Sequence, residues 1–210
     1  MALADWCFIS VSELADYMGV AIVAPADVAM AELIIEGVTG HLEGETARKL
    51  KSRTYSPATD EGNTIYDGDG STMLFTRQYP LTALAKIIVD STTVSDGADT
   101  LHWYKSGRVV YESGFTKDYR NVQVYYTAGY VEGTSEYAEL KMLSLMLCAA
   151  VYQMYTAAPG LGLYDSGKIG QYQYKIGAVF GWLGMVLEGS SAEGLQTMAA
   201  IKKYRRKLGM

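Results

Sequence analysis

The spacing of apolar residues changes twice along the 210-residue chain and divides it into three regions. Residues 10 to about 50 have a helical period, residues 52 to about 130 form short β-rich runs, and the helical period returns from Ser135. Helices on both sides of one block of strands predict an α+β fold, with a small antiparallel β unit inserted into a mainly helical core.

Two N-terminal helices are predicted in the first region. Ser10 and Glu13 have the spacing of a capping box, and the helix that they start should end at Gly19. A second helix should open near Pro25, where a missing N–H costs little. Its apolar residues follow steps of three and four: Val28, Ala31, Ile35, Val38 and Leu42. Two glycines weaken this helix and mark either its end or a close packing contact: Gly37 and Gly40.

The middle region has the composition of strands separated by turns. The expected strands are 64–66, 72–75, 85–89 and 122–126. Ser106-Gly107 joins two further runs into a predicted hairpin, 101–104 and 108–111.

The third region begins with a long central helix, for which Ser135 is the expected N-cap. Because residues 142–151 are apolar around almost the whole circumference, this helix is expected to be mostly buried. A glycine-rich segment follows, in which residues 171–176 suit a strand or an extended arm, and a last helix opens at Ser190. The predicted organisation is a helical core, a β insertion, an arm and a C-terminal helix: 1–51 with 134–158, 52–130, 159–189 and 190–210.

Charge is distributed unevenly along the chain. The net charge is −5, from 18 basic and 23 acidic residues, yet five basic residues fall in the last nine positions: Lys202, Lys203, Arg205, Arg206 and Lys207. The remainder therefore has 13 basic and 23 acidic residues and carries about −10. A mainly acidic body argues against general affinity for nucleic acid, which depends on neutralising phosphates.

Cysteine usage and the hydrophobic runs suggest where the protein folds. Cys7 and Cys148 match no metal or redox spacing, and Cys148 lies in an apolar run typical of a small buried side chain. The first residues lack the pattern of a signal peptide, and no apolar run approaches the length of a membrane span. We therefore expect a protein made in a cytoplasm, with no membrane partner.

The sequence contains no catalytic constellation and no cofactor motif, so neither an enzyme nor a cofactor or metal site is expected. His41 and His102 lie in no metal-binding pattern and are interpreted as structural or surface residues. One segment, Asp67-Gly68-Asp69-Gly70, alternates acids with glycine as some calcium loops do. Position twelve counted from Asp67 is Gln78 and not glutamate, so we favour a tight turn.

Two features have more than one interpretation. The 17 tyrosines suit either core filling or protein interfaces, and both stay open for Tyr125, Tyr126, Tyr172 and Tyr174. The basic C-terminal helix suits a solvated helix end, a DNA contact or a docking helix for an acidic partner.

Several phrases resemble the head-tail connector (adaptor) family of tailed phages. They are Tyr66 to Ser71, Gln78-Tyr79-Pro80-Leu81 followed by Ile87 to Asp90, Arg120 to Tyr130, and Ser166 to Tyr174. The opening stretch from Ser12 to Gly40 also resembles the family's first helix pair. The likeness covers most of the chain, and it is the order and spacing of the phrases that carries it.

The resemblance implies a non-enzymatic virion protein that forms a ring, commonly of twelve copies, in the neck between head and tail. Its implied partners are the portal protein, neighbouring copies, a downstream head-closure or tail protein, and double-stranded DNA passing without sequence-specific binding. The expected portal-docking residues lie in the last helix: Leu195, Met198, Ile201, Lys202, Lys203, Tyr204, Arg205 and Arg206. Arm contacts between copies are expected at Lys168, Tyr172 and Tyr174.

Three other functions compete with the adaptor interpretation. One is a tail-completion or head-closure protein of the same neck, which differs only in position. Another is a small hydrolase using Asp67, Asp69 and a histidine, and the third is a free-standing calcium-binding β module.

Overall fold

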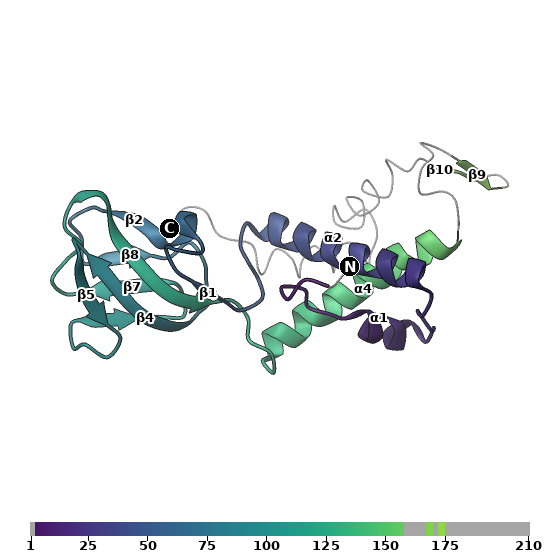
Figure 1. The fold of residues 1–210 in the computed structure, drawn as a ribbon, viewed down its shortest axis with the longest axis horizontal. Helices are drawn as coiled ribbons and strands as arrows, with labels where there is room; N and C mark the ends of the chain where they lie inside the picture. The colour runs from purple at the N-terminus through teal and green to yellow at the C-terminus, as the bar shows by residue number, and fades with distance from the viewer. Residues whose placement is uncertain (1–2, 158–166, 170–171, 175–210) are drawn as a thin grey trace. The chain divides into compact units, whose positions relative to one another are not determined.

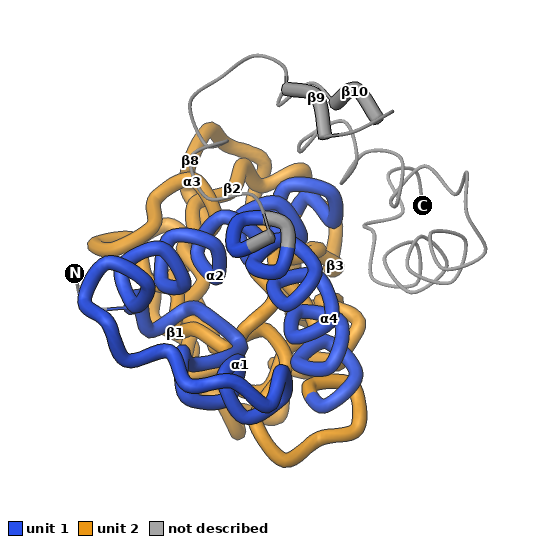
Figure 2. The backbone as a smooth tube through the Cα atoms, turned by 90° about the vertical axis from the view of Figure 1, so that its right-hand side faces the viewer, with its two compact units in different colours: residues 1–47, 138–210 blue, residues 48–137 orange. Residues whose placement is uncertain are grey.

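The computed structural model describes residues 3–157, 167–169 and 172–174, and it divides the chain into two compact units. Unit 1 comprises residues 1–47 and 138–210, and unit 2 comprises residues 48–137 (Figure 2). Helices and antiparallel strands are both present, so the α+β class is confirmed. The expectation of a mainly helical core with a small β insertion is not confirmed, because the strands are numerous and β1 to β8 dominate unit 2 (Figure 1). The predicted helix 190–210 lies outside the described residues.

Helix α1, Val11–Met18, has the boundaries that its sequence predicts. Ser10 is the N-cap, and its hydroxyl accepts a hydrogen bond from the Glu13 N–H while the Glu13 carboxylate accepts one from the Ser10 N–H. Gly19 ends the helix in the left-handed conformation at φ +66°. The capping box therefore specifies this helix start correctly.

Helix α2, Pro25–Thr46, starts at the predicted proline and is longer than its glycines suggested. The expected apolar stripe is buried from Ala31 through Leu42. Both interpretations of Gly37 and Gly40 were wrong: the helix continues past them, and an added Cβ at either position would meet no atom within 4 Å. These glycines lie on the exposed face of α2, so no contact requires a small residue there.

Helix α4, Ser135–Ala157, begins one residue earlier than predicted. Its N-cap is Thr134, whose hydroxyl accepts a hydrogen bond from the Tyr137 N–H at 3.3 Å, so Ser135 is the first helical residue. Leu140, Leu143, Leu147 and Cys148 are among its buried residues. Met142 and Met146 are each 48 % exposed, so the expectation of a mostly buried helix holds for one side only.

A five-stranded antiparallel sheet forms the larger layer of unit 2. Its strands are β1 (Arg53–Tyr55), β2 (Ile65–Gly68), β4 (Leu81–Val89), β5 (Thr92–Ser95) and β8 (Asp118–Ala128). The order is β1-β8-β4-β5, and β2 pairs with the same side of β8 as β1 does, further along the strand. Strands β1 and β2 therefore form one edge of the sheet, and β5 forms the opposite edge. The short helix α3, Glu61–Thr64, leads into β2.

A three-stranded sheet of order β3-β7-β6 forms the second layer of unit 2. Its strands are β3 (Met73–Phe75), β6 (Leu101–Trp103) and β7 (Arg108–Tyr111). The predicted hairpin of the last two is confirmed, with Leu101 paired to Tyr111. Its turn closes where the Gly107 N–H donates to the Tyr104 carbonyl, and Gly107 takes a φ of +87° that favours glycine.

One hydrophobic core joins the two sheets of unit 2. Phe115, Val109, Val124 and Tyr126 are at most 1 % exposed within it. The Tyr126 ring stacks on Tyr55 with centroids 5.0 Å apart, and its hydroxyl donates to the Asn63 carbonyl. Burial raises the pKa of Tyr126 well above its ordinary value, because the phenolate would be desolvated. Tyr126 therefore fills the core, and the interface interpretation was wrong for it.

The chain enters and leaves unit 2 through adjacent segments. Tyr130 bridges to Lys51, and its backbone also bonds to Leu50 and Ser52. The buried Arg48 closes this junction by donating to the Tyr79 carbonyl at 2.9 Å and to the Tyr130 hydroxyl at 3.0 Å. Burial raises the pKa of Tyr130, and the neighbouring Arg48 cation opposes that rise.

The described residues beyond α4 form two short antiparallel strands, β9 (Gly167–Ile169) and β10 (Tyr172–Tyr174). They fall within the predicted arm, 159–189, the rest of which lies outside the described residues. Among the described helices, none has both the length and the hydropathy that crossing a bilayer requires.

Candidate interaction surfaces

The loop between α1 and α2 exposes an unusual run of apolar side chains. Residues 20–26, Val-Ala-Ile-Val-Ala-Pro-Ala, cover this loop and the first two residues of α2 and contain no polar side chain. Val23 is 81 % exposed and Val20 is 49 % exposed, and Tyr17 of α1 adds a further 44 % exposed ring. Loops usually carry polar residues, and contiguous exposed apolar surface is typical of a protein contact. The run is readable in the sequence, but our predictions did not use it.

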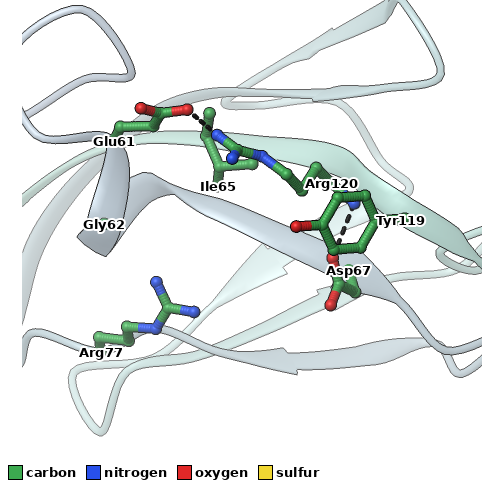
Figure 3. A pocket seen from close by; sticks show the side chains of 7 residues that line it. All are labelled: Glu61, Gly62, Ile65, Asp67, Arg77, Tyr119 and Arg120. Atoms are coloured by element: carbon green, nitrogen blue, oxygen red, sulfur yellow. Dashed lines mark hydrogen bonds and ion pairs between the residues drawn. The ribbon is translucent and has the colours of Figure 1, made fainter.

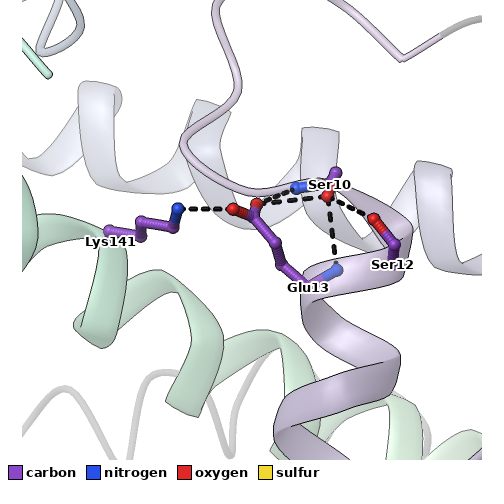
Figure 4. Close-up of polar contacts among 4 residues, drawn as sticks. All are labelled: Ser10, Ser12, Glu13 and Lys141. Carbon is purple, nitrogen blue, oxygen red and sulfur yellow. Dashed lines mark hydrogen bonds and ion pairs between the residues drawn. The ribbon is translucent and has the colours of Figure 1, made fainter.

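A polar contact fixes α1 to α4 within unit 1. The Lys141 ammonium donates to the Glu13 carboxylate, the same carboxylate that completes the capping box with Ser10 (Figure 4). Burial alone would raise the pKa of Glu13, but the Lys141 hydrogen bond and the Ser10 N–H together hold it below its ordinary value. This contact holds the first helix against the long helix that exposes Met142 and Met146.

Unit 2 exposes apolar side chains on one face of its smaller sheet. Met73 and Phe75 of the edge strand β3 are 48 % and 58 % exposed and flank the buried Leu74. The register places Phe75 opposite Arg108, whose guanidinium lies 4.0 Å from the ring centroid of Tyr104. This face is a second candidate surface for another protein.

A pocket of about 310 Å³ lies at the edge of the larger sheet formed by β2. Figure 3 shows Arg77 and Arg120 in its walls, with Glu61 and Asp67. Arg120 has a left-handed backbone, at φ +53°, in which its N–H donates to Asp67 at 2.7 Å and its guanidinium pairs with Glu61. The pocket is a mixed-charge cavity, and no sequence motif predicts it.

The Arg77 guanidinium points into this pocket (Figure 3). It lies 4.9 Å from the ring centroid of Tyr66, and it makes no ion pair or hydrogen bond with any residue that the structure describes. Stacking on a tyrosine face orients a guanidinium and leaves its N–H edges available to an acceptor.

The acid–glycine segment is built as a structural turn. Asp67 accepts the Arg120 N–H, and Asp69 accepts the Ser71 N–H at 2.8 Å. Hydrogen bonds from Ser71 lower the pKa of Asp69. Gly70 has a φ of +86°, as the turn requires, whereas Gly68 continues strand β2 and is needed for another reason: an added Cβ there would lie 1.8 Å from the Thr116 carbonyl oxygen.

The described residues offer no metal-binding group of three or more histidine, cysteine or acidic side chains. His102 lies 3.6 Å from Glu112 at an exposed position, and His41 is half-buried on α2. Within the described part of the chain, no contact joins either histidine to Asp67 or Asp69. Cys7 and Cys148 are buried free thiols, and burial raises the pKa of Cys148 to about 12, so its reactive thiolate is suppressed.

The sequence predicts portal docking through the C-terminal helix and arm contacts through residues 168–174. The whole set from Leu195 to Arg206 lies outside the described residues. Lys168 lies on β9, paired with Gln173, while Tyr172 and Tyr174 lie on β10.

No family model and no curated protein matches the chain. Solved structures do match it in fold, over 100 % of its length. A chain from the neck of an empty gene transfer agent (GTA) particle, computed with C6 symmetry, superposes with a TM-score of 0.57 at 16 % identity. A chain from the neck of the native GTA particle, computed with C12 symmetry, gives 0.55 at 15 %, and one from the native GTA virion gives 0.54 at 17 %. In each case 96 % of the other chain is covered.

Proposed function

We propose that this chain is a structural protein of the neck of a phage-like particle, acting as a head-to-tail adaptor. The observation that carries this proposal is the fold shared with neck chains of GTA particles over the full length of this chain and 96 % of theirs. Shared fold alone is weak evidence for function, since one fold hosts many activities. Here it agrees with the independent resemblance of the sequence to phage adaptors.

The surface chemistry of the described residues supports a role in assembly rather than catalysis. Each unit exposes apolar side chains, at Val20 and Val23 in unit 1 and at Met73 and Phe75 in unit 2. Exposed apolar groups of this kind suit a protein whose faces are covered by partners in a particle. The acids that suggested a hydrolase or calcium site are engaged in backbone hydrogen bonds instead.

The assembly that we propose is a closed ring, with twelve copies as the expected number, between the portal and the next neck or tail component. The cyclic symmetries of two neighbours, C6 and C12, are compatible with that number. The acidic first segment supports a channel wall along which DNA slides: residues 1–47 contain eight acidic residues and no lysine or arginine.

The C-terminal segment is the proposed contact with the portal. Leu195, Met198 and Ile201 supply an apolar side, and Lys202, Lys203, Arg205 and Arg206 supply positive charge for an acidic portal surface. Tyr204 continues the three-residue spacing of these apolar residues in the sequence. Lys168, Tyr172 and Tyr174 are proposed to contact neighbouring copies.

Electron microscopy of the full chain mixed with the portal ring of its particle tests this proposal. A chain truncated after Gly189 is the matched comparison, since it keeps every described residue. We expect a closed collar on the portal with the full chain and none with the truncated chain. An intact portal that binds neither chain would overturn the adaptor role and favour a tail-completion or head-closure position. A collar with both would overturn only the docking role of the C-terminal segment.

A further inference from the structure

The Arg77 pocket is built to receive an acceptor that none of the described residues provides. The Arg77 side chain is half-buried, so part of its hydration is lost. Within the described residues it gains only the Tyr66 ring in return. The second cation of the pocket, Arg120, by contrast forms an ion pair with Glu61. A carboxylate held at hydrogen-bond distance from Arg77 would complete this arrangement.

The charge balance of the pocket selects a protein carboxylate over a DNA phosphate. Two arginines line the pocket together with Glu61 and Asp67, so the formal charge of the lining is zero. Binding to the DNA backbone depends on excess positive charge that displaces counterions, and this pocket has none. Recognition here rests on hydrogen bonds that the N–H groups of the Arg77 guanidinium donate at short range.

A suitable carboxylate is present at the opposite edge of the same sheet. The turn that follows the edge strand β5 carries Asp96 and Asp99, both exposed, and residues 87–104 contain no lysine or arginine. Asp96 is engaged, because it accepts a hydrogen bond from the Trp103 indole N–H at 3.1 Å. Asp99 makes no ion pair or hydrogen bond with any described residue.

We propose that Asp99 of one copy docks into the Arg77 pocket of the next copy, an inference that rests on the proposed ring. In a cyclic assembly each copy offers one surface to the copy before it and a different surface to the copy after it. The β2 edge and the β5 edge of the larger sheet, β1/β2-β8-β4-β5, are two such surfaces, and they are chemically matched. Within one chain Asp99 cannot reach the Arg77 pocket, because the β2 edge and the β5 edge are separated by the width of three strands.

Charge exchange between the two positions provides the first test, with portal-bound collars of the full chain counted by electron microscopy. Arg77→Glu and Asp99→Arg should each reduce collars at least about tenfold, because an unmatched charge is then held in the contact. The double variant restores an attractive pair and should regain collars. Lys105→Glu and Glu132→Arg change exposed charges elsewhere in unit 2 and should leave collars unchanged. Melting curves check that every variant is folded.

Disulfide cross-linking locates the contact directly. In assembled collars, the double variant Arg77→Cys with Asp99→Cys should form a ladder of multimers on oxidation, while either single variant should stay monomeric. A mixture of the two single variants should stop at dimers. Cys7 and Cys148 are buried and do not compete. Collars of the double variant that give no ladder on oxidation would overturn this contact and leave the ring intact. A wild-type chain that forms no collar would overturn the proposed function, and this contact with it.

Discussion

At Gly68, strand β2 passes close to the backbone of Thr116, and a single methyl group there should destabilise unit 2. An added Cβ would lie 1.8 Å from the Thr116 carbonyl oxygen and 2.9 Å from the Asn121 side-chain oxygen. The Gly68 N–H also donates to that same Asn121 oxygen at 2.8 Å. The Gly68→Ala variant must therefore move the backbone by more than an ångström, because a carbonyl in a fixed loop cannot rotate away as a flexible side chain can.

The expected cost combines two effects. Overpacking a buried site typically costs 1–3 kcal/mol, roughly, and loss of the hydrogen bond to Asn121 adds about 1 kcal/mol. We therefore expect Gly68→Ala to lower the free energy of unfolding by about 3 kcal/mol. For a chain of this size that corresponds to a fall in Tm of about 6–12 °C. Urea denaturation followed by circular dichroism measures the free energy, and hydrogen exchange of β8 amides assigns the loss to unit 2.

Gly37→Ala is the matched control in unit 1. No atom lies within 4 Å of a Cβ built there, and the residue is in the interior of α2. Alanine should stabilise the helix by about 0.5–1 kcal/mol. If the free energy of unfolding of Gly68→Ala lies within about 1 kcal/mol of the wild-type value, the close approach to Thr116 does not constrain the fold and the packing argument fails.

Two further substitutions test the polar contacts of each unit. Arg48→Ala removes a buried cation that bonds to the Tyr79 carbonyl and the Tyr130 hydroxyl, and it should cost about 2–4 kcal/mol in urea denaturation. A loss below about 1 kcal/mol would mean that water replaces the guanidinium at no cost. Glu13→Gln removes a carboxylate whose pKa is lowered in the folded state by Lys141 and Ser10. A lowered folded pKa gives stability that is present above the unfolded pKa, about 4.3, and lost as pH falls through the folded pKa. The variant should therefore lose no more than about 1 kcal/mol at neutral pH, since both side chains are about a third exposed, and it should show a weaker fall in stability with acid. An acid profile identical to that of the wild type would refute this role.

Local signals in the sequence predicted the type and the first residue of an element well where the residue that gives the signal has a single structural role. The Ser10–Glu13 capping box and Pro25 each identified a helix start correctly. The N-cap predicted at Ser135 is one position too late, because the preceding residue, Thr134, has an equally good capping hydroxyl. Gly37 was misleading, since glycine lowers helix propensity locally while the buried stripe of α2 keeps the helix intact by tertiary packing.

The candidate surfaces were harder to predict, because they depend on what is left uncovered after folding. Met142 and Leu143 are adjacent apolar residues in the sequence, yet the first is half exposed and the second is buried. Arg77 has no sequence neighbour that indicates a site, since its pocket is assembled from α3, β2 and β8. The spacing of Asp67 and Asp69 suggested a calcium loop, whereas their actual partners are backbone N–H groups that no motif specifies.

The adjacency of the segments that enter and leave unit 2 has an evolutionary consequence. Because Lys51 and Tyr130 lie next to each other, the β unit begins and ends at one point, much as a loop does. Such a unit can be enlarged, exchanged or lost in a lineage without rethreading the helices that flank it. The helical unit and the β unit are thus free to diverge at different rates.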